Sequence, residues 1–258
     1  MRSVALHCEV AGPDEGPAVL FGGSLGSSLS MWEPQLAAFS PHMRTVAFDH
    51  RGHGGSPVPE GPYSIAEMGA DVVALMDRLE LERAAYVGLS IGGMVGQWLA
   101  AHHPERVREL VLLTTTAHFE DQAPWLERAA TVRAAGTTEV IADAVLARWF
   151  TPDWAASHAA RIAELRAMIC ATPATGYAAC CIAIGEMDLR PDLSRITAPT
   201  LVIGGAQDPS IPPAHQRAIA QALPGSRLEI LEDAAHLPNI QHPGAVNKLI
   251  ANHLGVSL

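Results

Sequence analysis

Gly88-Leu89-Ser90-Ile91-Gly92 is the most informative stretch of this chain, because it fits the pattern G-x-S-x-G between a strand-like and a helix-like segment. The apolar run 84–87 predicts a short buried strand, and the spacing of apolar side chains over 94–102 predicts a helix. On so tight a turn a serine projects its hydroxyl above the end of the sheet, and flanking glycines let the two backbones pass closely. Ser90 is therefore a candidate nucleophile. The alternative is that the pentapeptide is only a flexible turn.

A catalytic serine needs a base to take its proton, and that base needs an acid to orient it. Of the twelve histidines, His236 follows the last predicted strand, where a loop at the carboxyl end of the sheet would bring it over Ser90. Asp208 has the corresponding place after the preceding strand. The order Ser90, Asp208, His236 is the order nucleophile, acid, base of α/β-hydrolases. Asp233 is nearer to the histidine in sequence, but on one short loop it is expected to form a turn with its own backbone.

Backbone N–H groups are expected to stabilise the oxyanion that forms when the serine attacks a carbonyl. The first belongs to Ile91, directly after the nucleophile, and the second to Leu25, in the glycine-rich loop 22–26. This loop lacks the Lys-Ser/Thr ending of a phosphate-binding P-loop and the spacing G-x-G-x-x-G. His50 and His53, on a second glycine-rich loop, are expected mainly to shape that loop.

Strand-like and helix-like segments alternate along most of the chain, which predicts an α/β fold with a mostly parallel sheet of the eight-stranded type, flanked by helices. The predicted strands are 4–10, 18–21, 45–48, 85–87, 110–113, 200–203 and 227–231, and the flanking helices are 32–39, 65–79, 94–103, 214–223 and 243–254. Between about 118 and 189 the strand signals vanish and the composition predicts an inserted helical lid. Its helices are expected at 125–135, 138–150, 155–169 and 175–185. We therefore expect a core domain of 1–117 and 190–258, with a cap of 118–189.

Composition argues against several classes of function. The 258 residues carry a formal net charge of −10 and Lys248 is the only lysine, so no broad basic patch for nucleic acid is expected. No segment approaches the roughly 18 apolar residues of a membrane span, and the amino terminus lacks the pattern of a signal peptide. The four cysteines form no regular disulfide framework, which favours a cytoplasmic setting. No His-Glu-x-x-His motif or Cys/His cluster indicates a metal, and no cofactor is expected.

With the triad placed, the chain resembles the α/β-hydrolase superfamily over essentially its whole length, and within it the 3-oxoadipate enol-lactonases of aromatic catabolism. Triad motifs mark only the superfamily, whereas passages of the cap carry the narrower resemblance. The matching passages are Ser24-Leu25-Gly26 with Met31-Trp32, Asp49-His50-Arg51-Gly52-His53-Gly54, Gly61-Pro62-Tyr63-Ser64-Ile65, Gly88-Leu89-Ser90 with Gly96-Gln97-Trp98, Arg148-Trp149-Phe150-Thr151-Pro152, Gly176-Tyr177 with Asp188-Leu189-Arg190, and Ala234-Ala235-His236-Leu237 with Asn239. The chain departs from the family at Gly23, where asparagine is frequent, and lacks the His-Gly that opens many hydrolase oxyanion loops.

The resemblance implies the hydrolysis of a five-membered enol-lactone that bears a free carboxylate, opened to an enol that tautomerises to 3-oxoadipate. Ser90 would attack the lactone carbonyl, and His236 would take its proton and later activate water against the acyl-enzyme. Asp208 would hold the histidine in the required tautomer. The expected partners are a small anionic lactone or ester and water, with neither nucleic acid nor a membrane.

An acidic protein that binds an anionic substrate needs a cation near the pocket, and the cap offers Arg128, Arg133 and Arg148. We expect Arg128 or Arg133 to bind the carboxylate, and Arg128 shares a helical face with an aromatic residue three positions earlier. The alternative for each arginine is a solvated surface position. The aromatic residues expected to line the pocket, unless they belong to the interior of the cap, are Trp125, Trp149 and Tyr177.

Two other functions fit the same sequence. A carboxylesterase or a carbon–carbon bond hydrolase would use the same triad on another carbonyl compound. A hydrolase-fold receptor would bind a small ligand without turnover, although such proteins usually lack a triad member and this chain has all three. A haloalkane dehalogenase is not expected, because that chemistry needs a carboxylate in place of Ser90. The sequence therefore predicts a serine hydrolase.

Overall fold

A seven-stranded sheet forms the centre of the protein in a computed structural model, which describes residues 3–258. Its strand order is β1-β3-β2-β4-β5-β6-β7. The strands are β1 (Cys8–Ala11), β2 (Ala18–Gly22), β3 (Arg44–Phe48), β4 (Ala84–Leu89), β5 (Val107–Leu113), β6 (Thr200–Gly205) and β7 (Arg227–Leu231). β1 pairs antiparallel with β3, and the other neighbouring strands pair parallel. The predicted α/β fold with a mostly parallel sheet is confirmed, with seven strands in the described residues rather than eight.

The first strand begins at Cys8, four residues later than predicted. In the segment before it, two backbone N–H groups donate to side chains rather than to a neighbouring strand. The N–H of Val4 donates to Oδ1 of Asp71 (2.8 Å), and the N–H of His7 donates to Oγ of Ser56 (2.8 Å). Apolar alternation predicted an extended segment here, but the backbone partners available to it decide where the sheet starts.

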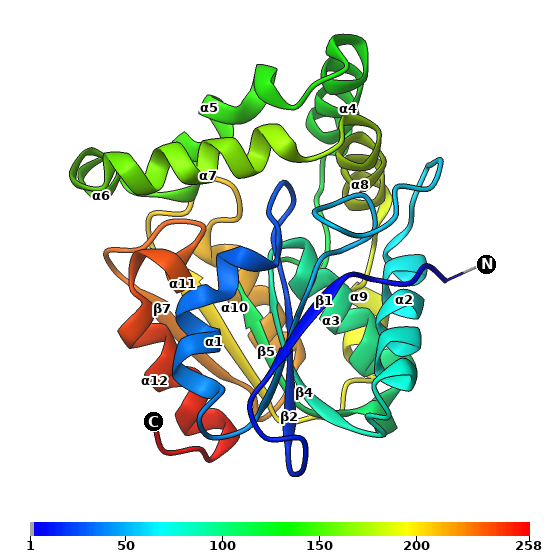
Figure 1. Cartoon of the computed structure of the whole chain (residues 1–258), viewed down its shortest axis with the longest axis vertical. Helices are drawn as coiled ribbons and strands as arrows, with labels where there is room; N and C mark the ends of the chain where they lie inside the picture. The colour runs from blue at the N-terminus through cyan, green and yellow to red at the C-terminus, as the bar shows by residue number, and fades with distance from the viewer. Residues whose placement is uncertain (1–2) are drawn as a thin grey trace.

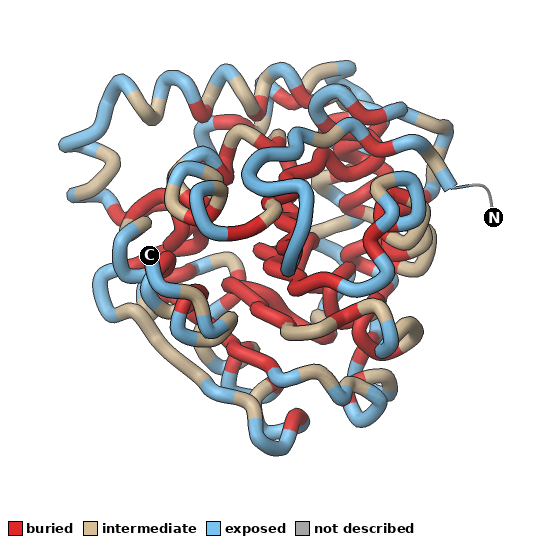
Figure 2. The backbone as a smooth tube through the Cα atoms, turned by 60° about the horizontal axis from the view of Figure 1, so that its bottom comes forward, coloured by how far each residue is buried: buried red, intermediate tan, exposed pale blue. Residues whose placement is uncertain are grey.

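Helices cover both faces of the sheet, because successive side chains of each strand point to opposite sides and most of them are apolar. Phe21 of β2 belongs to the apolar cluster of one face, and Leu20 belongs to that of the other. The helices of the first face are α1 (Glu33–Phe39), α11 (Pro238–Gln241) and α12 (Pro243–Leu254), and those of the second are α2 (Ile65–Arg78), α3 (Ile91–His102) and α10 (Pro213–Ala222). Figure 2 shows the buried segments in the interior of the molecule and the exposed segments around it.

Five helices from the middle of the chain lie over the carboxyl ends of the strands, at the top of Figure 1. They are α4 (Ala123–Ala135), α5 (Glu139–Trp149), α6 (Pro152–Ser157), α7 (Ala159–Ala171) and α8 (Ala174–Glu186). Within this cap α4 packs against α8, and α5 packs against α7. The chain enters and leaves the cap at neighbouring points, because His118 and Asp188 form an isolated antiparallel bridge.

The single helix expected at 155–169 is two helices, α6 and α7, which are separated at His158. The Ser157 hydroxyl donates to the carbonyls of Asp153 (2.9 Å) and Trp154 (3.0 Å), and Nδ1 of His158 lies 2.9 Å from the Trp154 carbonyl. Side chains that bond to helical carbonyls compete with the backbone N–H groups that would continue the helix. Local polar side chains thus explain the break, which apolar periodicity did not reveal.

Among residues 3–258, no single helix is long and apolar enough to cross a membrane. The pair α7 and α8 reaches that length and composition only when the two helices are counted together, and they are bent by 90° at their junction.

Candidate active site

Ser90 lies on the turn between β4 and α3 with φ 57° and ψ −118°, a strained conformation for a residue with a side chain. Its N–H donates to the carbonyl of Leu113 (3.0 Å), and its carbonyl accepts a hydrogen bond from the hydroxyl of Thr115 (2.7 Å). Leu113 ends the neighbouring strand β5, and Thr115 lies two residues beyond it. Two bonds from this strand and the segment that follows it therefore hold the turn that carries Ser90.

Gly92 lets α3 begin directly against the segment of residues 22–27, called here the 22–27 loop. A Cβ atom on Gly92 would lie 2.1 Å from the carbonyl oxygen of Gly22, far inside van der Waals contact. The N–H of Gly92 donates to the carbonyl of Gly23 (3.1 Å). A side chain at this position would separate the helix from the loop, so the second glycine of the G-x-S-x-G pattern is a packing requirement.

Asp208 and His236 form a buried, hydrogen-bonded pair, with Nδ1 of the histidine 2.7 Å from Oδ2 of the aspartate. The other carboxylate oxygen, Oδ1, accepts from the backbone N–H groups of Ser210 (2.8 Å) and Ile211 (3.1 Å). These amides orient the carboxylate, and its bond to Nδ1 leaves Nε2 as the ring nitrogen that is available to take a proton. The side chain of Asp233 is exposed, so of the two acids considered Asp208 is the one that contacts the histidine.

The loop that carries His236 is bonded both to the sheet and to the cap. The hydroxyl of Thr114, at the end of β5, donates to the carbonyl of His236 (2.8 Å). The N–H of Leu237 donates to the carbonyl of Trp149, the last residue of α5 (3.0 Å). The position of the histidine therefore depends on the docking of the cap as well as on the sheet.

Two residues beside Ser90 carry backbone N–H groups that could donate: Leu25 lines the same pocket, and Ile91 directly follows the serine. In the 22–27 loop, the carbonyl of Ser24 accepts from the N–H (3.1 Å) and the hydroxyl (2.7 Å) of Ser27. Because a trans peptide unit is planar, a carbonyl held in this way directs the N–H of Leu25 to the opposite side. Ile91 is the first residue of α3, where a backbone N–H has no acceptor within the helix. These are the two amides that the sequence suggested.

A small pocket between the sheet and the cap joins these groups, and Ser90, His236 and Leu25 line it from the core. Its lining from the cap consists of Trp125, Arg128, Val145, Arg148, Trp149 and Tyr177. The three aromatic residues considered from the sequence all lie here. The free space is about 30 Å³, room for one or two water molecules, so cap side chains must move to admit a larger ligand. Among residues 3–258, no group of three or more His, Cys, Asp or Glu side chains is arranged to hold a metal ion.

Arg128 and Arg148 bring two positive charges to this pocket. The guanidinium of Arg128 lies 4.8 Å from the centre of the Trp125 ring, on the same face of α4. Burial lowers the pKa of Arg148, and the neighbouring charge of Arg128 lowers it further. Within the described residues 3–258, neither arginine forms an ion pair with a carboxylate. Two neighbouring guanidinium groups without a counter-charge form a favourable site for an anion.

Arg133, the other arginine expected at the pocket, lies elsewhere. It is exposed and lines a separate surface hollow with Glu60 and Thr175. Five residues along an α-helix correspond to a rotation of about 140°, so Arg133 points away from the face of α4 that carries Arg128. Arg148, from the end of α5, lines the pocket instead of Arg133.

Ser210 and Ile211 also line the pocket and were not predicted from the sequence. They follow Asp208 by two and three residues, and their N–H groups bond to its carboxylate. An aspartate often bonds to the backbone two residues further on in this way. Their spacing of two and three residues after the proposed acid could therefore have identified them from the sequence.

The whole chain is similar to known hydrolases. A family model described as alpha/beta hydrolase fold matches residues 17–243. The protein named 3-oxoadipate enol-lactonase 2, from Acinetobacter baylyi, is 41% identical over 249 residues, which cover 96% of this chain and 92% of that protein. The crystal structure of the enol-lactonase from Burkholderia xenovorans matches this structure with a TM-score of 0.95 and 40% sequence identity. The match covers 98% of this chain and 97% of the enol-lactonase chain. A thermophilic esterase from Thermogutta terrifontis has a TM-score of 0.91 and 29% identity, with coverage of 98% and 93%. This chain belongs to the α/β-hydrolase fold family and is a hydrolase related to 3-oxoadipate enol-lactonases.

Proposed function

We propose that this protein opens an enol-lactone that carries a carboxylate, with 3-oxoadipate enol-lactone as the substrate and 3-oxoadipate as the product. The observation that carries the proposal is the pair Arg128 and Arg148, which line the same pocket as Ser90 and His236 and have no carboxylate partner within residues 3–258. A substrate carboxylate supplies that counter-charge. A neutral ester would leave both guanidinium groups without one.

The reaction begins when Oγ of Ser90 attacks the lactone carbonyl while Nε2 of His236 takes the serine proton. The N–H groups of Leu25 and Ile91 stabilise the oxyanion of the tetrahedral intermediate. The ring C–O bond then breaks, His236 gives the proton to the departing enol oxygen, and the acyl group stays on the serine. Water attacks the acyl-enzyme with the same histidine as base, and the ester bond to Oγ breaks as His236 returns a proton to the serine. The released enol tautomerises to the ketone. Asp208, bonded to Nδ1, keeps the imidazole in the required tautomer throughout.

The cap supplies recognition in this proposal. Arg128 and Arg148 bind the substrate carboxylate, and the rings of Trp125, Trp149 and Tyr177 pack around the lactone. Residues 118–189 act as the cap domain, and 1–117 with 190–258 act as the core domain that carries the nucleophile, the acid and the base. Because the pocket is so small, the cap side chains shift when the substrate enters.

We further propose a cytoplasmic setting and a role in the catabolism of aromatic compounds. All four cysteines lie among the described residues and are free thiols, in keeping with a reducing compartment.

The test is a coupled assay on 3-oxoadipate enol-lactone made enzymatically, with the wild-type protein and the variant Ser90→Ala, and with p-nitrophenyl acetate as a neutral ester. We expect turnover of the lactone by the wild type and none by the variant. The competing function is that of a carboxylesterase or a carbon–carbon bond hydrolase, because the same groups would act on another carbonyl. Hydrolysis of p-nitrophenyl acetate without turnover of the lactone would reject the lactonase proposal and leave an esterase.

A further inference from the structure

His53 is a fully buried histidine that the proposed reaction does not use. It lies on the loop between β3 and α2, and 1% of its surface is exposed. Nε2 of its ring accepts a hydrogen bond from the N–H of Gly26 (2.9 Å). Because a backbone N–H can only donate, the ring proton lies on Nδ1, which faces the carbonyl of Arg51 at 3.3 Å. The partners on both sides thus select one neutral tautomer.

Gly26 directly follows Leu25, whose N–H is the proposed oxyanion donor of the 22–27 loop. The peptide unit before Leu25 is held through the carbonyl of Ser24, to which Ser27 donates twice. The peptide unit after Leu25 contains the N–H of Gly26, which donates to His53. Both peptide units that flank Leu25 are therefore fixed, one within the loop and the other by the histidine. We propose that His53 is a positioning residue, which holds the 22–27 loop in the conformation that directs the Leu25 N–H toward the oxyanion.

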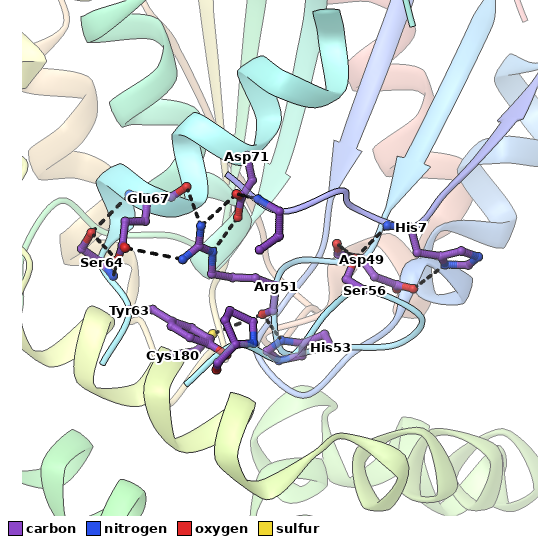
Figure 3. A network of polar contacts seen from close by, with 12 residues as sticks. His7, Asp49, Arg51, His53, Ser56, Tyr63, Ser64, Glu67, Asp71 and Cys180 are labelled. Atoms are coloured by element: carbon purple, nitrogen blue, oxygen red, sulfur yellow. Dashed lines mark hydrogen bonds and ion pairs between the residues drawn. The ribbon is translucent and has the colours of Figure 1, made fainter. Parts of the chain in front are cut away.

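The loop that carries His53 is itself rigidly held, which such a role requires. The guanidinium of Arg51 makes two bonds to the buried carboxylate of Asp71 on α2 (2.6 and 2.8 Å). The carbonyl of Arg51 faces both His53 and Sγ of Cys180, from the cap helix α8 (3.8 Å) (Figure 3). Asp49, at the start of this loop, accepts from the N–H of Leu29, just beyond the 22–27 loop (2.6 Å). The histidine is thus anchored to α2 and to the cap while it contacts the 22–27 loop.

Close backbone packing leaves little room for the 22–27 loop to relax away from this position. A Cβ atom on Gly26, whose φ is +80°, would lie 3.1 Å from the ring of Tyr177 on α8. A Cβ atom on Gly52, next to His53, would lie 2.7 Å from Cα of Gly176, also on α8. One turn of the cap helix therefore packs against both loops. The hydrogen bond from Gly26 to His53 is a polar link between two loops that the same helix covers.

The electrostatics of the site favour the neutral histidine that this role needs. Burial lowers the pKa of His53, and the opposing effects of the Arg51 carbonyl and of the Asp49 charge are smaller. Only the unprotonated Nε2 can accept from Gly26. The buried environment therefore keeps Nε2 of His53 unprotonated, so that it can accept the hydrogen bond from Gly26.

The proposal is tested with the whole chain of 258 residues and p-nitrophenyl acetate, so that the outcome does not depend on the identity of the lactone. It builds on the assignment of Ser90 and Leu25 in the proposed function, which Ser90→Ala tests separately. His53→Phe keeps a buried ring but removes the acceptor, and His53→Gln restores an acceptor oxygen. We expect His53→Phe to lower kcat about 10-fold at nearly constant KM, since a displaced oxyanion donor costs less than the ~10²–10³-fold of a deleted one. His53→Gln should recover most of this loss.

The decisive readout is the inhibition constant of a small alkyl trifluoromethyl ketone, which forms a tetrahedral oxyanion on the serine and so reports on the oxyanion donors. It should rise about 10-fold in His53→Phe, in parallel with the fall in kcat. His253→Phe is the matched control. The ring of His253 contacts the carbonyl of Pro199 at the amino end of β6, whereas Ser90 lies at the carboxyl end of the sheet. Unchanged inhibition in a folded His53→Phe protein would overturn the proposal. If that variant does not fold, equal kcat values and equal inhibition in His53→Leu and His53→Gln would overturn it as well.

Discussion

The two sides of the pocket are built differently. On the core side, the backbone of Ser90 and the carboxylate of Asp208 each bond to other parts of the core, and His236 bonds to that carboxylate. On the cap side, Arg128 and Arg148 are half-buried and, within residues 3–258, have no carboxylate partner. Groups that take part in bond-making must be held in place before the substrate arrives. Groups that recognise a charge gain their partner from the substrate itself, so in the proposed function catalysis belongs to the core and recognition to the cap.

The largest effect should come from Ser90→Ala, which removes the proposed nucleophile on the core side. We expect kcat to fall by about 10⁵-fold or more for both the anionic lactone and p-nitrophenyl acetate, because every bond-making step passes through this hydroxyl. Steady-state assays on the two substrates measure it, and labelling by a fluorophosphonate probe should be lost as well. Substantial residual turnover of either substrate would contradict a serine mechanism.

Asp208→Asn should have the next largest effect. The amide cannot stabilise the imidazolium and favours the wrong tautomer of His236, so kcat should fall by about 10⁴-fold on both substrates. Asp233→Asn is the matched control, since the Asp233 side chain is exposed and His236 bonds to Asp208 instead. A larger loss in the control than in Asp208→Asn would show that the acid has been wrongly assigned.

Arg128→Met should distinguish the recognition proposed for the cap from the catalysis proposed for the core. Removing one charged partner of the substrate carboxylate should lower kcat/KM for the enol-lactone by about 100-fold. Hydrolysis of p-nitrophenyl acetate should change little, because that ester has no carboxylate. Arg133→Met, on the same helix but outside the pocket, should leave both activities unchanged. Equal losses on the two substrates would mean that Arg128 supports the structure of the cap rather than recognition.

Gly92→Ala should have the smallest effect in free energy, and it addresses the packing of the core side. The added Cβ would lie 2.1 Å from the Gly22 carbonyl oxygen, so the free energy of unfolding should fall by about 2 kcal/mol. Gly244→Ala is the control, because no atom lies within 4 Å of a Cβ at that position of α12, and it should stabilise the helix by about 0.5–1 kcal/mol. Denaturant unfolding of the two variants measures the difference. Equal stabilities would argue against the tight contact between α3 and the 22–27 loop.

Much of the fold could be predicted because its signals are local. The apolar runs of β2, β4 and β6 gave their own positions to within two residues, since a strand buried on both faces is apolar throughout. The break at His158 was missed, because it comes from side-chain bonds to helical carbonyls and not from apolar periodicity. The start of β1 was also missed, since it depends on partners contributed by Asp71 and Ser56, far along the chain.

The candidate site, like the fold, could be predicted where its signals are local. Ser90, Asp208 and His236 were proposed from the sequence because each lies on the segment that follows a strand of one parallel sheet, and the carboxyl ends of such strands share an edge. The structure joins the acid and the base by a bond of 2.7 Å and places the serine in the same pocket. The catalytic roles of all three stay predictions until the variants are measured.

Local patterns were enough to predict the tight turn at Ser90, the order of the proposed triad and membership of the hydrolase family, because these depend on short-range backbone geometry and on the order of the strands. Packing placed Arg148 rather than Arg133 beside Arg128, because that choice depends on how α4 and α5 are rotated against the core. It also decided that His53 contacts Gly26. The physical reason is that side-chain direction between distant elements is set by packing, which no local pattern records.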